Sequence, residues 1–397
     1  MPADAPLGGR KNGFEQAGSA INNFSEEVTR RMNGGASLEA AREEILGQVE
    51  ANFEAFLAQR DRDRPFFYWF GPTLIHRLFV QGSGKSLWGI DPDRLQGHLP
   101  EFLPDVPEVR EDVADYLGEI QAWDAAVGRL MVVLERHQLL DNTLVMLSGD
   151  HGMPGMPRGK CNLYDFGTAV PLIAAGPSVP AGRVVDDLVS LMDLAPTWLE
   201  WAGVEVPELM AGRSLLPQLM ANHSGQVEVD RDFVLTGRER HVADAREDGL
   251  PYPQRALRTS QYLYIRNFHP DRWPMGSPKL AEDPAEEGRL AKETMVGYTD
   301  MDASPTKAWL IANRGSEIGR ELYRLAFAKR PFEELYLLES DPDQVHNVAS
   351  EPEHEDLLYQ LRSRMDRELL RWGDPRMVGR DDYYETPPMA GSLPAKK

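Results

Sequence analysis

The stretch from Leu144 to Pro171, which reads LVMLSGDHGMPGMPRGKCNLYDFGTAVP, constrains the fold of this chain more than any other. The run Thr143–Leu147 is short, apolar and partly β-branched, which is typical of a buried strand. Five glycine and proline residues follow between positions 152 and 159, so the chain there continues neither as a helix nor as a strand. A second apolar run, Val170–Ala175, predicts another strand.

Three ionisable side chains lie between these two predicted strands: Asp150, His151 and Lys160. In open α/β sheets, ligands bind outside the carboxyl ends of the strands. We therefore expect a carboxylate, an imidazole and an ammonium group on one rim of a sheet. From these residues alone a second interpretation stays open, in which the acid and the imidazole belong to an ordinary turn and Lys160 is a solvated loop lysine.

The other patterns predict strands that alternate with helices, which favours a mostly parallel sheet covered by helices. Ser37 is a plausible N-cap for an amphipathic helix that reaches Phe56, and an apolar stripe from Val109 predicts a long helix that ends near His137. Further elements are expected as strands at 66–70, 233–236 and 335–338, a hairpin at 256–267, and helices at 196–201 and 352–372.

Two segments carry little periodicity. Residues 1–36 are rich in Gly, Asn and Ala and predict an irregular surface segment. Residues 270–315 are rich in Pro, Gly and charge and predict a long surface loop.

Basic side chains follow two more of the predicted strands. His76 and Arg77 come after the aromatic run 66–70, and Arg238 and His241 come after 233–236. The sequence GSGKS at 82–86 resembles the end of a phosphate-binding loop, but Phe79 stands where the motif needs its first glycine and no helix pattern follows. We therefore reject nucleotide binding and retain Lys85 as a candidate substrate contact.

Composition excludes several classes of protein. The formal net charge of −20 disfavours nucleic acid as a partner, and no run of 18 apolar residues exists that would insert into a membrane. The single cysteine, Cys161, rules out a disulfide framework within the chain. The first 18 residues lack the apolar core of a signal peptide.

Three features together resemble the sulfatase family, from about Pro65 to Ala349. The stretch Leu335–Ala349 is similar to the C-terminal strand and turn of that family, and His76 stands where sulfatases carry an active-site histidine. The likeness is to bacterial enzymes of the arylsulfatase or sulfamidase kind. The second signature of the family is matched by Asp150, His151, Gly152, Lys160, Tyr164, Gly167 and Pro171.

The resemblance implies an alkaline-phosphatase-like α/β fold, in which helices sandwich a mostly parallel sheet. Residues 1–250 would form an N-terminally incomplete α/β domain, and residues 251–397 a subdomain with a small antiparallel sheet and a terminal helix. The implied activity is the hydrolysis of sulfate esters, or sulfamates, of carbohydrates or aryl compounds, with one Ca²⁺ per site. Because the family is often exported, the implied location is periplasmic or secreted.

The chain departs from the family at its nucleophile, which is a formylglycine made from the Cys or Ser of a C-x-P-S-R motif. Neither C-x-P-S-R nor S-x-P-S-R occurs in the 397 residues, and Cys161 lies inside the second signature instead. The early strand with paired metal aspartates is also missing. We therefore expect an incomplete calcium ligand set and no activity from this chain. We expect a formylglycine-generating or anaerobic maturase partner only for a full-length form.

Roles for single residues follow from the resemblance. Lys160 would contact the sulfate, and His76 would contact it and protonate the leaving oxygen. Asp150 and His151 would belong to the metal site, although calcium prefers carboxylate oxygen to imidazole. Basic residues at loop or strand ends, each with solvated surface charge as its alternative, would bind anionic groups of the substrate: Arg77, Lys85, Arg238 and His241.

Two other functions stay open. A phosphodiesterase or phosphonate hydrolase of the same superfamily shares the fold, but its metal site is usually richer in His and Asp. A non-catalytic binder of sulfated glycans is compatible with the missing nucleophile. The DNA upstream of codon 1 distinguishes these, because an in-frame C-x-P-S-R motif there would support the hydrolase.

Overall fold

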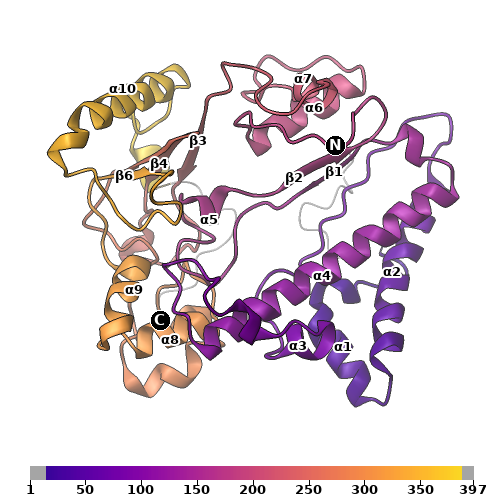
Figure 1. Ribbon diagram of the computed structural model, residues 1–397, viewed down its shortest axis with the longest axis horizontal. Helices are drawn as coiled ribbons and strands as arrows, with labels where there is room; N and C mark the ends of the chain where they lie inside the picture. The colour runs from indigo at the N-terminus through magenta and orange to yellow at the C-terminus, as the bar shows by residue number, and fades with distance from the viewer. Residues whose placement is uncertain (1–14, 387–397) are drawn as a thin grey trace. The chain divides into compact units, whose positions relative to one another are not determined.

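The computed structural model describes residues 15–386, which cluster into two compact units (Figure 1). Of the described residues, unit 1 comprises 15–99, 105–145 and 175–177, and unit 2 comprises 100–104, 146–174 and 178–386. No helix among the described residues is both long enough and apolar enough to cross a membrane. The predicted domain boundary after residue 250 stays a prediction.

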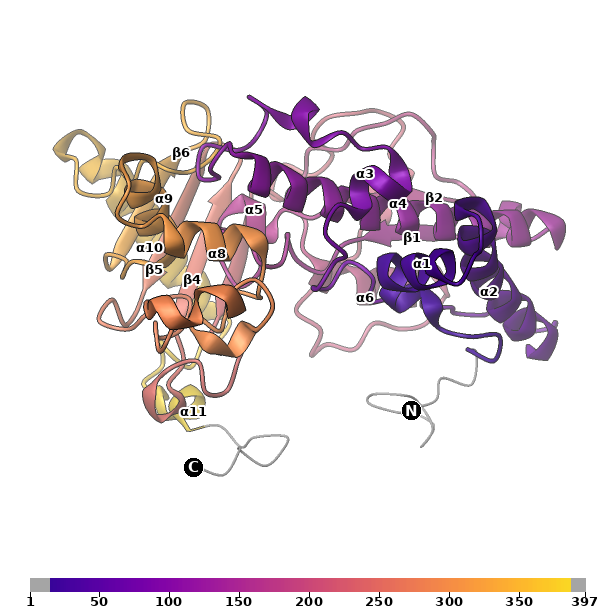
Figure 2. The same ribbon diagram turned by 90° about the horizontal axis from the view of Figure 1, so that it is seen from below.

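Unit 1 is built from helices, and the two longest lie side by side in both ribbon views (Figures 1 and 2). The predicted helix after Ser37 is confirmed as α2 (Leu38–Gln59), and the Ser37 hydroxyl accepts the Ala40 amide at 3.2 Å. The predicted helix from 109 is confirmed as α4 (Pro107–Arg136). Ile45 and Val49 of α2 pack in one core cluster with Ala122 and Ala126 of α4.

Three expectations for unit 1 are wrong. The part of segment 1–36 that the structure describes contains α1 (Phe24–Asn33), because Ile21, Phe24 and Val28 have helical spacing and are buried. Residues 66–70 form no strand; Phe66 and Tyr68 pack on α2, whereas Phe67 and Trp69 are exposed. A short helix, α3 (Ser83–Trp88), does follow Gly82.

Unit 2 contains the strands around the 144–171 stretch. The predicted strands are confirmed as β1 (Val145–Ser148) and β2 (Leu172–Ala175), which together form a two-stranded sheet. The predicted helix at 196–201 is confirmed as α6 (Leu194–Trp201). Two shorter helices, α5 (Asp165–Thr168) and α7 (Leu216–Met220), complete this region.

The C-terminal part of unit 2 carries an antiparallel sheet in the order β3-β4-β5-β6. Leu257 and Tyr264 are cross-strand partners that pack against the helix α10, whereas Ala256 and Ile265 pack on the opposite face with Tyr164. This alternation confirms the predicted hairpin and strands. The elements are β3 (Phe233–Arg238), β4 (Gln254–Thr259), β5 (Tyr262–Asn267), β6 (Glu333–Leu337) and α10 (Glu355–Arg371).

The prediction of a surface loop over 270–315 is wrong. This segment contains α8 (Pro305–Ala312), and Met275, Tyr298 and Leu310 are buried with Phe327 of α9 (Glu317–Phe327) in one core cluster. The apolar residues occur singly among Pro, Gly and charged residues, so no periodicity marks them. A last short helix, α11 (Asp382–Glu385), lies near the end of the described residues.

Short 3-10 helices occupy further positions in both units: η1 (Ala20–Asn23), η2 (Pro92–Leu95), η3 (Leu140–Asn142), η4 (Leu191–Asp193), η5 (Glu247–Gly249), η6 (Pro284–Arg289), η7 (Thr294–Val296) and η8 (Pro352–His354).

Candidate functional site

Asp150 and His151 follow the end of β1, as the sequence predicts. The Asp150 side chain is 88% exposed, and its Oδ2 lies 3.7 Å from Nε2 of His151. Nδ1 of His151 lies 2.8 Å from the carbonyl oxygen of Gly152. Since a carbonyl only accepts, Nδ1 is the donor in this hydrogen bond.

Glycine is required where the loop after β1 folds back on itself. A Cβ on Gly152 would lie 1.8 Å from the carbonyl oxygen of Phe166, and one on Gly167 would lie 2.5 Å from that of Gly159. The Gly152 amide donates to the Gly167 carbonyl at 2.9 Å. The close packing of these segments fixes the backbone that leads to Lys160.

The Lys160 side chain is buried against a carboxylate. Its Nζ lies 3.1 Å from Oδ2 of Asp302, and the two side chains are only 10% and 11% exposed. Ser304, two residues further on, donates its hydroxyl to the Gly155 carbonyl at 2.6 Å. The segment that contains Asp302 and Ser304 therefore holds the glycine-rich loop at two points.

Arg238 at the end of β3 is held by Asp300 of the same segment. Nη2 of Arg238 lies 2.6 Å from Oδ2 of Asp300, which also pairs with Arg246 and accepts the Val242 amide at 3.0 Å. Burial alone would raise the pKa of Asp300, but the charges of Arg238 and Arg246 outweigh it, so the pKa lies below its ordinary value. Asp300 is therefore an anion at neutral pH.

His241 belongs to the same cluster. Partial burial and then the charge of Lys160 lower the pKa of its imidazole, while Asp300 and Asp302 act in the opposite direction. The structure thus brings together Lys160, Arg238 and His241, which sequence reasoning selected separately. We call these three residues, with Asp300 and Asp302, the basic cluster.

Lys307 lies close enough to Asp300 and Asp302 to feel their charges. Its side chain is fully buried, and its Nζ donates to the carbonyl oxygens of Met301 at 2.8 Å and Tyr298 at 3.2 Å. Desolvation lowers its pKa to about 7. Sequence reasoning missed Asp300, Asp302 and Lys307 because they lie in the segment predicted to be a surface loop.

The remaining predicted residues lie in unit 1. Nδ1 of His76 lies 2.9 Å from the Arg77 carbonyl oxygen, and the Arg77 guanidinium forms a buried ion pair with Asp112. Lys85 is exposed and lies 3.2 Å from Oδ1 of Asp91. The prediction that His76 acts on the same substrate as Lys160 stays a prediction, as do the predicted roles of Arg77 and Lys85.

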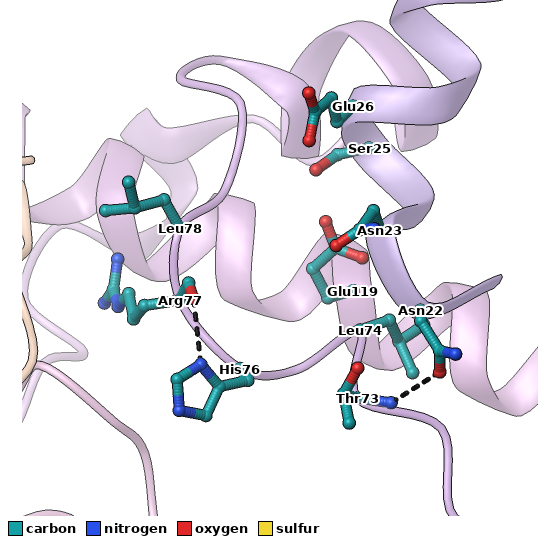
Figure 3. A pocket seen from close by; sticks show the side chains of 10 residues that line it. All are labelled: Asn22, Asn23, Ser25, Glu26, Thr73, Leu74, His76, Arg77, Leu78 and Glu119. Carbon is teal, nitrogen blue, oxygen red and sulfur yellow. Dashed lines mark hydrogen bonds between the residues drawn. The ribbon is translucent and has the colours of Figure 1, made fainter. Parts of the chain in front are cut away.

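His76 and Arg77 line a pocket of about 300 Å³ between α1, α4 and the loop 73–78 (Figure 3). Its inner wall carries Glu119 of α4, which is 2% exposed. Burial raises the pKa of this carboxyl to about 7, although hydrogen bonds from Ser25 oppose the shift.

The described residues do not complete a calcium site around Asp150. Calcium takes about six to eight oxygen ligands, whereas Asp150 and His151 supply one carboxylate and one imidazole. In the part of the chain that the structure describes, the side chains close enough to hold a metal as a group of three are instead Glu351, Glu353 and His354, an acidic surface cluster.

Two family models match the chain. The sulfatase model matches residues 9–204, and the model described as the C-terminal part of N-sulphoglucosamine sulphohydrolase matches residues 158–301. Both include the stretch that contains Lys160.

Curated relatives are named as sulfatases or as N-sulphoglucosamine sulphohydrolase. An ulvan-active sulfatase of Formosa agariphila is 29% identical over 70% of this chain and 41% of its own length. The human N-sulphoglucosamine sulphohydrolase is 28% identical over 86% of this chain and 67% of its own length. A second ulvan-active sulfatase of the same bacterium is matched over 43% of its length, so the chain spans about two fifths to two thirds of the length of these relatives.

One solved structure, reported with the metabolism of glycosaminoglycans by Bacteroides thetaiotaomicron, has a TM-score of 0.58 at 18% identity. It covers 88% of this chain and 63% of the other. At this identity the likeness concerns the fold alone, and it confirms the predicted alkaline-phosphatase-like α/β class with a C-terminal antiparallel sheet. The sheets that residues 15–386 form are the two-stranded one of β1 and β2 and the four-stranded antiparallel one, so these residues do not themselves form the larger parallel sheet.

Proposed function

Because the chain belongs to the sulfatase family, we propose that its basic cluster binds the sulfate group of a sulfated glycan for hydrolysis of the sulfate ester or sulfamate. The observation that carries this proposal is the convergence of Lys160, Arg238 and His241 on one acidic segment. The family's activity is sulfuric ester hydrolysis, and two relatives are named for ulvan and for N-sulphoglucosamine.

The charge balance of the cluster favours an anion. Lys160 and Arg238 of the cluster, together with Arg246, which shares Asp300 with Arg238, contribute three positive charges, and Asp300 and Asp302 contribute two negative ones. The net charge of this group is about +1 while His241 is neutral. This excess stands out in a chain with a formal net charge of −20. A sulfate would share the Lys160 ammonium with Asp302, and both lie where little water reaches.

The cluster's contribution to hydrolysis would be electrostatic. Negative charge develops on the sulfuryl oxygens and the leaving atom as the S–O or S–N bond breaks, and a fixed ammonium stabilises that charge without reorganisation. The lowered pKa keeps the His241 imidazole mostly neutral at pH 7, so it would act there as a hydrogen-bonding group. We propose His76 as the proton donor to the leaving atom.

We propose calcium as the metal, held by Asp150 together with oxygen ligands beyond those that the described residues supply. When bound, the ion would add positive charge beside the sulfuryl oxygens. The formylglycine nucleophile and its maturase would belong to a protein that carries the C-x-P-S-R motif. We also propose a periplasmic or secreted location, in keeping with the relative named an extracellular sulfatase.

Binding tests the proposal in the chain as it exists. We expect glucosamine N-sulfate to bind in calorimetric titration, and Lys160→Ala to weaken the binding about tenfold through loss of a charge-assisted hydrogen bond. Lys292→Ala removes an exposed lysine of the same unit and should change nothing. Equal affinity of the Lys160→Ala variant and the wild type would refute the proposal.

Two further ligands separate the alternatives. Tighter binding of phenylphosphonate than of phenyl sulfate would favour the phosphonate hydrolase. We expect no turnover of an aryl sulfate, because no C-x-P-S-R motif is present in the 397 residues. If the protein hydrolyses the aryl sulfate and Lys160→Ala abolishes this activity, that expectation is wrong. Binding without hydrolysis is the result predicted both for a hydrolase that lacks its nucleophile and for a glycan binder.

A further inference from the structure

The pocket in unit 1 has a polar rim and an acidic inner wall (Figure 3). At the rim, the Asn22 side-chain oxygen accepts the Thr73 amide at 2.9 Å, and Asn23 is exposed beside it. Glu119 of α4 forms the inner wall, opposite the loop that carries His76. The volume of about 300 Å³ is at the lower end of the range for small-molecule sites.

Glu119 has an unsatisfied hydrogen-bonding capacity. Its Oε2 is buried and has no hydrogen-bond partner among residues 15–386, and the residue is only 2% exposed. The hydroxyl and amide of Ser25 bond to the carboxyl, and that amide lies in the first turn of α1, where helical amides lack an intrahelical partner. Buried polar atoms are satisfied in most proteins, so an unpartnered oxygen on a residue that lines a pocket indicates a missing donor, which a small shift of the side chain would let a ligand supply.

The surroundings of Glu119 are acidic. Asp112, Asp115 and Glu119 recur along α4 at intervals of three and four residues and are 2%, 3% and 2% exposed. Asp112 pairs with Arg77, and Asp115 accepts the amides of Gly82 and Gly84 at 2.9 and 2.8 Å. Burial raises the pKa of Asp115 to about 6, and the nearby carboxylates add to the shift.

The other ionisable groups of the pocket wall do not reverse this balance. Glu26 of α1 adds a further carboxyl, and the Arg77 charge is neutralised by its buried partner Asp112. His76 is exposed at the rim. A positively charged ligand would therefore be attracted, whereas an anion would be repelled.

We propose that this pocket binds a small hydroxylated molecule with a primary ammonium group, the ammonium on Glu119 and the hydroxyls on the Asn22 and Asn23 rim. A bare metal ion fits less well, because Glu26, His76 and Glu119 are not among the side chains, in the described part of the chain, whose ligand atoms come within 4.8 Å of one another. His76, proposed above as a proton donor, also lines this pocket, but the binding of an ammonium here rests on Glu119 and not on sulfate binding at Lys160.

Ethanolamine is the probe, and ethylene glycol is its uncharged match. In two-dimensional NMR of the 397-residue protein, ethanolamine should shift the amide signals of Ser25 and Thr73, and ethylene glycol should bind much more weakly. Between pH 6 and pH 8 the ionised fraction of a carboxyl with a pKa of about 7 rises about tenfold, while an aliphatic amine stays protonated. The affinity for ethanolamine should therefore rise up to about tenfold over this range.

Glu119→Gln should abolish most of the binding and its pH dependence. The matched control is Glu111→Gln, which changes a half-buried carboxyl of α4 that accepts from Gln81 at 2.6 Å and does not line the pocket, and it should bind like the wild type. Asn23→Ala changes a residue at the exposed rim and should weaken the binding of ethanolamine about threefold. This variant tests the proposal if the Glu119→Gln protein does not fold. Unchanged binding in the rim and Glu119 variants, equal binding of ethylene glycol, or an equal loss in the Glu111→Gln control would each overturn the proposal.

Discussion

Unit 1 buries Asp112, Asp115 and Glu119 along α4, whereas unit 2 buries Asp300 and Asp302 in the segment before α8. The fractional exposures are similar, yet the pKa of Glu119 is raised to about 7 and that of Asp300 lies below its ordinary value. In both cases burial is the largest cause and raises the pKa. The difference lies in the partners: Asp300 forms ion pairs with two guanidinium groups, whereas the hydrogen bonds that Glu119 receives within the described part of the chain come from Ser25.

Burial alone therefore does not determine the protonation state of a carboxyl group in this protein. In unit 2 the arginines keep the carboxylates charged, and the carboxylates in turn hold the basic side chains that we assign to sulfate. In unit 1 the three acids on α4 have one paired cation, Arg77, which contacts Asp112. Asp115 and Glu119 therefore keep raised pKa values and can take up protons near neutral pH.

The largest effect is expected at Asp300. Asp300→Ala leaves the buried guanidinium groups of Arg238 and Arg246 without their shared carboxylate, so it should lower the free energy of unfolding by about 3–5 kcal/mol. Urea denaturation measures this, with Asp150→Asn as the control because that side chain is 88% exposed. A change of less than about 1 kcal/mol in Asp300→Ala would mean that unit 2 does not depend on this pairing.

The opposite behaviour is expected for Glu119. Because its folded pKa is raised, the folded state binds the proton more tightly than the unfolded state, and stability falls as the pH rises from about 4.5 to about 7. Glu119→Gln removes this term. The free energy of unfolding of the wild type should therefore drop by about 2 kcal/mol more between pH 5 and pH 8 than that of the variant. Parallel pH profiles would contradict the assignment.

Lys307 provides a test with the reverse sign. Its folded pKa is lowered to about 7, so the folded state releases the proton before the unfolded state does, and stability should rise as the pH increases from about 7 to about 10. Lys307→Met should lose this rise and should destabilise the protein by about 1–3 kcal/mol at neutral pH through loss of the carbonyl hydrogen bonds. Thermal unfolding at several pH values measures both effects.

The smallest effect is expected for an ion pair on the surface. Arg324 and Glu321 lie 2.5 Å apart on α9, but their side chains are 60% and 61% exposed. Arg324→Ala should therefore change the free energy of unfolding by about 0.5 kcal/mol or less. A change as large as that in Asp300→Ala would show that charge pairing stabilises the protein irrespective of burial.

Periodicity predicted the regular elements of this protein. The helices α2, α4 and α10 and the hairpin of β4 and β5 have apolar residues at regular spacing, because one face of each is buried. The aromatic run at 66–70 has the composition of a strand but forms none, because a strand also requires a neighbour with which to pair.

Part of the candidate site was also predictable. Asp150, His151 and Lys160 follow β1 within a glycine-rich loop, and this arrangement is visible in the sequence. The roles of Asp300 and Asp302 could not be predicted from the sequence, because their partners Arg238 and Lys160 lie 62 and 142 residues away along the chain. Contacts between residues so far apart in the sequence produce no periodic pattern, and a single sequence contains no other signal for them.

One consequence concerns changes in length between residues 300 and 307. Surface connections usually tolerate inserted or deleted residues, but this short stretch binds Arg238 through Asp300, Lys160 through Asp302 and the Gly155 carbonyl through Ser304. Consecutive Cα atoms lie about 3.8 Å apart, so a single inserted residue would put at least one of these contacts out of reach. We therefore expect its length to be far less variable than its proline, glycine and charge content suggests.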